Sequence, residues 1–448
     1  MPEYPCTLWH SSFGVGDGQD MASRGYLRAL MEVGYEHVVV SPRGLPREFH
    51  FAAEYEDFRP IFGFPEKFVK KLKRVEPGDP RIGSKWEHLE PMTIPPPAHA
   101  PKKAATITWD AIVQEGEIDN DYYHDHPEEL GTDWTPRNEL IVLHYDPGQL
   151  ARARDAIAIE SGGEVPVVGI TAWETSGVPP AIAQQLSDLD LLIVPSSHTA
   201  RAFRGSGLDV DCPIKVVPHT LGFHPLTDAE ATRASRAAHR QYRFYTIGTD
   251  IPRKNLRTLI AAFCHAFYPS FEQVKLIIKT SLDAARARKL IREGVELFGK
   301  PCNPSVVVFG EKWSDAQIRQ LHDQGNCWVD ANRGEGFGLG QVEAAAMGNP
   351  VITTGWGAAP EALDFPGVMV VKTEYTMRPV DDEMANIGPY RGDQLWADPE
   401  VNSIVDAMRT AAVERWPKSL SQARAVGERY SRRKIGETLA RALEGAKD

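Results

Sequence analysis

One segment in the last third of the chain joins a strand, a glycine-rich loop and a helix. It reads Cys327-Trp-Val-Asp-Ala-Asn-Arg-Gly-Glu-Gly-Phe-Gly-Leu-Gly-Gln-Val-Glu-Ala-Ala-Ala-Met-Gly-Asn-Pro350, followed by the strand-like Val351-Ile-Thr-Thr354. Glycines let a backbone turn tightly and approach a ligand, and the free N–H groups at a helix start favour an anion such as phosphate. Glu335 and Glu343 would flank that anion and suit sugar hydroxyls. The segment therefore indicates a nucleotide-sugar, although such turns also occur as plain connections.

Strand-like and helix-like stretches alternate along most of the chain, which predicts an α/β fold with parallel sheets and helices on both faces. Strands are predicted at 5–10, 37–41, 140–144, 165–170, 191–194, 215–217, 244–247, 274–279, 305–309, 327–329, 351–353 and 368–371. Helices are predicted at 20–33, 256–267, 283–297, 314–324, 340–347 and 421–444. Between residues 42 and 138 the alternation fails, and we expect an irregular insertion with a hairpin around 104–113.

The length of the chain favours two domains. Each half of 448 residues is large enough to bury its own core. Prolines, a glycine and an arginine-rich stretch place the break near residues 218–238. Ligands of doubly wound sheets bind at the carboxyl ends of the strands, so a cleft between two such sheets suits a donor and an acceptor.

Composition excludes several classes of protein. The net charge of −11 gives no global attraction to nucleic acid or to an anionic membrane. The five cysteines are scattered without metal-ligand spacing, which favours reduced thiols. The start, Met-Pro-Glu-Tyr, is not typical of a signal peptide, and no run approaches the 18 apolar residues of a membrane span. A cytoplasmic location is therefore expected.

Four stretches, in order, resemble the retaining GT-B glycosyltransferases, especially those of family 4. Glu335-Gly-Phe-Gly-Leu-Gly-Gln-Val-Glu343 resembles their glutamate–seven–glutamate motif, and residues 245–256 are similar to their glycine–lysine loop. Residues 173–180 with 191–197 resemble the end of the acceptor domain, and residues 214–222 resemble the interdomain linker.

The resemblance implies an α/β GT-B fold, in which two Rossmann-like doubly wound domains face each other across a cleft. An acceptor-binding domain is expected over residues 1–222, with the insertion at about 42–138. A nucleotide-sugar-binding domain is expected over 223–425, and a C-terminal helix over 426–448 would cross back to the first domain.

The resemblance also implies a retaining, metal-independent transfer with a nucleotide-diphosphate sugar as donor and no cofactor. The expected catalytic residues are Glu335, Lys254, Arg253 and His144. The expected donor-binding residues are Gly16, Gly248, Thr249, Phe309, Gly310, Gly336, Phe337, Gly338, Leu339 and Glu343, with Trp173 and Glu174 on the acceptor side. Thr249 departs from the family, which has an arginine directly after the loop glycine; this removes a diphosphate contact unless Arg253 supplies it. Structural roles stay open for Phe309 in a core, for His144 after a buried strand and for the lysine in a solvated loop.

Other motifs leave alternatives open. The glycines at 14, 16 and 18 lack the dinucleotide spacing, which argues against a nicotinamide cofactor. His124-Asp-His126 with Glu128 and Glu129 could hold a metal, but a solvated loop is the commoner reading.

A basic stretch with interleaved aromatic residues suggests a second acceptor. Its members are Phe62, Phe64, Lys67, Phe68, Lys70, Lys71, Lys73 and Arg74. A basic helix face is the default reading, but such a stretch could contact nucleic acid, so an acceptor of hydroxymethylated DNA is one alternative. A non-catalytic scaffold that binds nucleotide-sugars is another, and Thr249 is its best support.

Overall fold

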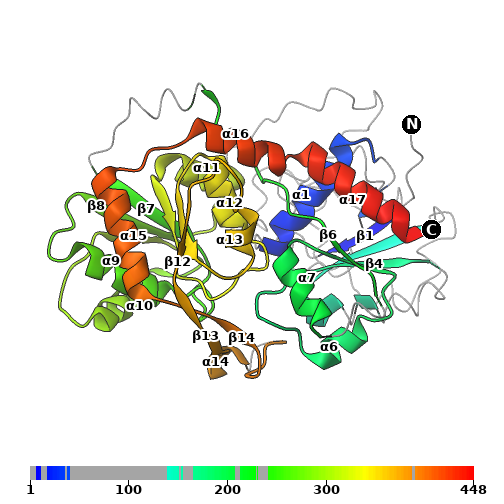
Figure 1. Cartoon of the computed structure of the whole chain (residues 1–448), viewed down its shortest axis with the longest axis horizontal. Coiled ribbons are helices and arrows are strands. Elements are labelled where there is room, and N and C mark those ends of the chain that lie inside the picture. Colours follow the sequence, from blue (N-terminus) through cyan, green and yellow to red (C-terminus); the bar gives the residue numbers. More distant parts are fainter. Residues whose placement is uncertain are drawn as a thin grey trace, which may run out of the picture.

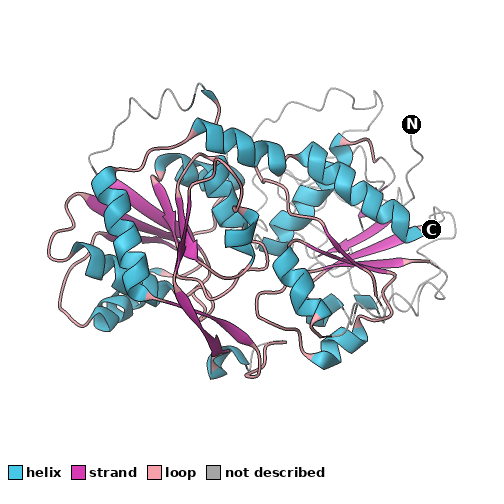
Figure 2. Ribbon diagram, viewed as in Figure 1, coloured by secondary structure: helices cyan, strands magenta, loops and turns pink. Residues whose placement is uncertain are grey.

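The computed structural model describes residues 7–11, 18–35, 38–40, 139–150, 153–154, 165–206, 212–228, 230, 241–385 and 389–447. Figure 2 shows two sheets flanked by helices, one in each half of the molecule. Gly16, the 42–138 insertion, the histidine cluster at 124–126 and the basic aromatic stretch lie outside the described residues. These features remain predictions.

The first sheet is parallel and has six strands in the order β2-β1-β3-β4-β5-β6. Its strands are β1 (Thr7–Ser11), β2 (Val38–Val40), β3 (Leu140–His144), β4 (Val167–Ile170), β5 (Leu191–Val194) and β6 (Ile214–Val216). Its helices include α1 (Gly18–Glu32), α6 (Pro180–Gln185) and α7 (Ser197–Arg204). The continuous apolar run of β3 is buried throughout, as expected for a central strand covered on both faces.

The second sheet is also parallel and has the order β12-β11-β10-β7-β8-β9. Its strands are β7 (Tyr242–Ile247), β8 (Val274–Lys279), β9 (Val306–Phe309), β10 (Cys327–Val329), β11 (Val351–Thr354) and β12 (Val370–Thr373). Its helices are α9 (Leu256–Phe267), α10 (Ala284–Phe298), α11 (Asp315–Gln324), α12 (Leu339–Ala346), α13 (Ala358–Ala362) and α15 (Val401–Glu414). The predicted strand ends differ from these bounds by at most two residues.

An antiparallel hairpin was not predicted from the sequence. It consists of β13 (Tyr375–Pro379) and β14 (Leu395–Pro399), with the short helix α14 (Asp382–Ala385) between them. The hairpin extends from the second domain to the lower edge of the molecule, between the two sheets (Figure 1). Trp396 on β14 is fully buried, which anchors the hairpin to its own domain.

Two helices at the C-terminus connect the domains. The stretch predicted as one helix at 421–444 is divided into α16 (Leu420–Arg429) and α17 (Arg432–Lys447). α16 passes from the second domain toward the first, and α17 lies along α1 (Figure 1). The contact is tight, because a Cβ atom on Gly436 would lie 2.2 Å from the carbonyl oxygen of Ala29. Among the described helices, none has the length and apolar composition that crossing a membrane requires.

Candidate functional site

The glycine-rich loop lies at the carboxyl edge of the second sheet, between β10 and α12. Gly338 has a φ of +84°, and a Cβ atom there would lie 2.5 Å from the Cβ of Ala359, so only glycine fits. Gly338 is also the N-cap of α12, and it offers no side chain to cap the first N–H groups. Within the described part of the chain, no backbone carbonyl accepts a hydrogen bond from the N–H of Phe337 or Gly338. The loop thus presents donors suited to an anion.

The first domain holds this loop directly. The Ser196 hydroxyl, at the N-cap of α7, donates to the carbonyl oxygen of Gly336 at 2.6 Å, and the Thr199 hydroxyl donates to the same oxygen at 3.2 Å. A Cβ atom on Gly334 would lie 2.3 Å from the carbonyl oxygen of Glu174. Glycine is therefore required where the backbones of the two domains meet.

A buried carboxylate supports the loop from below. Asp330 follows β10, and its Oδ2 accepts hydrogen bonds from Trp328 Nε1 at 2.7 Å and Gln341 Nε2 at 2.9 Å. Its Oδ1 accepts from Thr353 Oγ1 at 3.0 Å. Burial raises the pKa of Asp330 to about 6, although these donors favour the ionised form. Asp330 links the strand, the helix and the neighbouring strand that frame the loop.

Two cations converge on Glu335. Lys254 Nζ lies 2.5 Å from Glu335 Oε1, and Arg253 Nη1 lies 3.3 Å from Glu335 Oε2. Arg253 also donates to the carbonyl oxygen of Gly334 at 2.8 Å. Burial opposes the charge on Glu335, but Lys254 and Arg253 outweigh it and lower the pKa of this carboxyl below 4.5. Glu335 is therefore ionised at neutral pH, with positive charge beside it.

Glu343 lies at the junction of the domains. Its carboxylate is buried, and its Oε1 accepts the N–H of Gly222, in the segment that links the two sheets, at 3.2 Å. Its Oε2 lies 3.7 Å from Nε2 of His322. Glu335 therefore precedes the N-terminus of α12, and Glu343 lies in the second turn of that helix.

The comparisons with known proteins concern the family of the second domain and the fold. Residues 241–385 match the family described as glycosyl transferases group 1. The matched residues lie in the second domain and include both the glutamate loop and the glycine–lysine loop.

Solved structures of similar fold match this chain over most of its length. The crystal structure of Anabaena Alr3699/HepE in complex with UDP and glucose is 14% identical, with a TM-score of 0.59, and covers 99% of this chain and 100% of that one. Its structure with UDP-glucose has a TM-score of 0.54 at 16% identity and covers 98% and 99%. Sucrose-phosphate synthase from Thermosynechococcus elongatus has a TM-score of 0.59 at 14% identity and covers 98% of each chain. The fold is therefore GT-B. No curated protein matches the chain in sequence.

The glycine–lysine loop of this chain lies beside the glutamate loop. A Cβ atom on Gly248 would lie 3.3 Å from Cδ of Lys254, so the lysine side chain packs across the glycine. The carbonyl oxygen of Thr249 accepts the N–H of Ile251 at 2.9 Å. Arg253 is the arginine of this loop that lies beside Glu335, at 3.3 Å. The resembled family has an arginine at the position of Thr249 instead.

Two of the predicted donor-binding residues, Phe309 and Gly310, lie at the carboxyl end of β9. Phe309 is half-buried rather than part of the core, and its ring lies 4.9 Å from that of Trp313. Lys279 Nζ, at the end of β8, lies 5.5 Å from the centroid of the Trp313 ring. The next residue, Gly310, lies against the backbone of Leu282 and leaves no room for a side chain. Trp313 and Lys279 were not predicted as site residues, because nothing in their local sequence points to a ligand.

On the first domain, the predicted residues are deeply placed. His144 is buried at the end of β3, and its Nδ1 lies 2.7 Å from the hydroxyl of Ser23. Trp173 is buried, and its indole N–H donates to the carbonyl oxygen of Gly177 at 2.8 Å. Glu174 remains partly accessible and pairs with Arg253.

Acid is expected to destabilise the first domain through two buried histidines. Burial lowers the pKa of His144 and of His219 from 6.5 to about 3, and His219 adds to the shift of His144. Both imidazoles bind protons near 6.5 only when unfolded, so the folded state loses stability as the pH falls from 6.5 toward 3. We expect a lower melting temperature at about pH 5 than at about pH 7, and a smaller decrease in His219→Gln. Equal decreases in both proteins would contradict this assignment.

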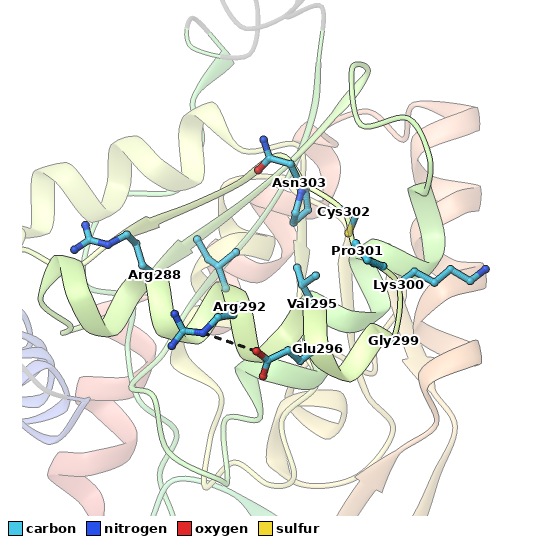
Figure 3. Close-up of a pocket in the computed structure, with 11 residues that line it drawn as sticks. Arg288, Arg292, Val295, Glu296, Gly299, Lys300, Pro301, Cys302 and Asn303 are labelled. Carbon is cyan, nitrogen blue, oxygen red and sulfur yellow. Dashed lines mark ion pairs between the residues drawn. The ribbon is translucent and has the colours of Figure 1, made fainter.

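A surface depression of about 540 Å³ lies far from this site. Figure 3 shows it between α10 and the loop before β9, with Arg288, Arg292 and Lys300 at its rim. The loop enters the amino end of β9, whereas Glu335 follows the carboxyl end of β10 in the same parallel sheet. The depression is therefore not part of the candidate site. Across the described ranges, no cluster of His, Cys, Asp or Glu is arranged to hold a metal.

Some site residues were missed by the sequence interpretation. Ser196 and Thr199 are polar residues directly after the buried strand β5, at the carboxyl edge where ligands bind, and this position was a usable signal. His219, in the segment that links the two sheets, has its ring centroid 5.0 Å from that of Phe337. Asp330 also follows a buried strand, but its carboxylate accepts a hydrogen bond from Gln341 of α12 and so supports the loop.

Proposed function

We propose that the chain transfers a hexose from a uridine diphosphate sugar to a hydroxyl acceptor, with retention of configuration and without a metal. The observation that carries this proposal is the convergence of Lys254 and Arg253 on Glu335, next to the uncapped start of α12. Lys254 and the free N–H groups suit a diphosphate, and Glu335 suits sugar hydroxyls. The UDP and glucose in the HepE structure support the choice of donor.

In the proposed reaction, Lys254 exchanges partners. Without donor it pairs with Glu335. A bound diphosphate would draw the ammonium away, and Glu335 would then accept hydrogen bonds from the sugar. The acceptor hydroxyl forms the new bond to the anomeric carbon on the face that the diphosphate leaves, and the leaving phosphate oxygen takes the proton. The protein orients both partners and stabilises the negative charge on the leaving group.

The two domains would divide the work. We propose that residues 1–222 bind the acceptor, that 223–425 bind the donor and that the helix over 426–448 completes the first domain. The proposal that DNA is the acceptor rests on the basic aromatic stretch at 62–74, outside the described residues, and remains a prediction. A cytoplasmic location also remains a prediction.

The proposal is tested by incubating the full chain with a panel of nucleotide-sugars. We expect slow release of UDP from a UDP-hexose, a thermal shift with UDP, and unchanged release in EDTA. A thermal shift without release from any donor would favour the non-catalytic scaffold. If no donor gives release of nucleotide and none gives a thermal shift, both functions are contradicted.

A further inference from the structure

The hairpin of the second domain forms an arm that contacts the first domain. We define the arm as β13, α14, residues 389–394 and β14. Its contact is made partly by backbone: the N–H of Ser176 donates to the carbonyl oxygen of Leu395 at 2.8 Å, and the N–H of Leu395 donates to Ser176 Oγ at 3.0 Å. The arm therefore has a fixed register on the 173–177 segment of the first domain.

Tyr390 is the arm residue that reaches deepest into this contact. Its ring stacks on Trp173, with centroids 5.1 Å apart and planes 22° apart. Its hydroxyl donates to Glu174 Oε2 at 2.8 Å. Burial, and then Glu174, raise the pKa of Tyr390, so the phenol keeps the proton that it donates.

Glu174 carries this contact to the catalytic loop. Its Oε1 lies 3.3 Å from Arg253 Nη2, while Nη1 of the same guanidinium lies 3.3 Å from Glu335 Oε2. The side chain of Arg253 is only 12% exposed, so its direction is set by these two carboxylates together with the carbonyl oxygen of Gly334. Burial opposes the charge on Arg253, but Glu174 and Glu335 outweigh it and raise its pKa. A single guanidinium thus joins an arm-held carboxylate to Glu335.

The arm is also attached to the backbone that carries Arg253. Arg333 Nη1 donates to the carbonyl oxygen of Pro252 at 2.9 Å and lies 3.0 Å from Asp381 Oδ2. Its Nε lies 3.3 Å from Asp398 Oδ1 on β14. The arm therefore constrains Arg253 from the backbone side as well as through Glu174.

We propose that Tyr390 is a positioning residue: by fixing Glu174 it orients Arg253, and through Arg253 it orients Glu335 for the donor sugar. This inference rests on the proposed function. Without the phenol hydroxyl, the Glu174 carboxylate can rotate to bring both oxygens onto Arg253 and so draw the guanidinium away from Glu335. The hydrogen bonds between Glu335 and the donor sugar would weaken. The nucleotide does not contact Glu335, so its affinity would stay the same.

The test compares Tyr390→Phe, Glu174→Gln and the double variant, using UDP-glucose and UDP as probes. Each substitution keeps the shape of the side chain. Tyr375→Phe is the matched control, because Tyr375 lies on the same arm and is 38% exposed. We expect kcat for release of UDP from UDP-glucose to fall about tenfold in each single variant and by little more in the double variant, because both break one chain of contacts. The Kd for UDP is expected to stay within about twofold.

The possible results separate the two proposals. Wild-type turnover in Tyr390→Phe, or independent and additive losses in the double variant, would overturn the positioning role and leave the proposed function standing. An equal loss in Tyr375→Phe would overturn it too, since the effect would then belong to the arm in general. A wild-type chain that neither releases nor binds any nucleotide-sugar would overturn both proposals.

Discussion

Replacement of Lys254 by alanine is expected to lower the turnover of a UDP-hexose by at least about a hundredfold, the usual scale for loss of one transition-state contact. Lys254 Nζ is within 2.5 Å of Glu335 and beside the uncapped start of α12, where the leaving diphosphate would gather charge. Steady-state release of UDP measures the effect. The affinity for UDP is expected to weaken as well, because the lysine would contact the phosphate before and after transfer.

The control for this prediction is Lys289→Ala. Lys289 is 61% exposed on α10 and pairs with Glu293 within the same helix, so its loss removes an exposed ion pair of small value. Lys289→Ala should retain wild-type turnover. Full activity in Lys254→Ala would remove the lysine from the mechanism.

Replacement of Glu335 by alanine is expected to lower kcat by a similar factor, at least about a hundredfold, with the opposite effect on nucleotide binding. Without the carboxylate, the donor sugar loses a hydrogen-bond acceptor. Lys254 loses its partner and becomes free to pair with phosphate, whereas Arg253 keeps its pairing with Glu174. UDP should therefore bind at least as tightly as in the wild type, as measured by calorimetry.

Glu296→Ala on α10 is the matched control, because Glu296 is 67% exposed and, among the described residues, its ion pair is with Arg292 of the same helix. A parallel loss of UDP affinity and turnover in Glu335→Ala would mean that the carboxylate supports the fold of the loop and does not hold the sugar. Turnover equal to that of the wild type would refute the assignment of Glu335.

The parts of the fold that the sequence predicts are those with local causes. The apolar runs of β3 and β5 set their own bounds, because a buried parallel strand needs a continuous apolar stretch. The loop at Gly338 could also be predicted from the sequence. Gly338 has a positive φ, and the other glycines of the loop lie too close to neighbouring atoms to carry a side chain. The arm was not predicted because β13 is mostly exposed and mixed in composition. Its apolar residues follow neither the alternation of a half-buried strand nor the spacing of an amphipathic helix.

The parts of the site that the sequence does not predict depend on contacts between distant residues. Tyr390 meets Glu174 across 216 positions, and Ser196 meets Gly336 across 140. No spacing rule connects residues that far apart. For His144, the position at the end of a buried strand was evident from the sequence. Its hydrogen bond to Ser23 and the lowering of its pKa by burial depend on the three-dimensional packing and were not.

The most direct test of the account is a crystal structure of the full chain with a UDP-hexose bound. The account predicts the diphosphate against Lys254 and the N–H groups that begin α12, with the hexose hydroxyls on Glu335 and the ribose near Glu343. A donor bound elsewhere, such as in the depression beside α10, with the Lys254–Glu335 pair still intact, would contradict it.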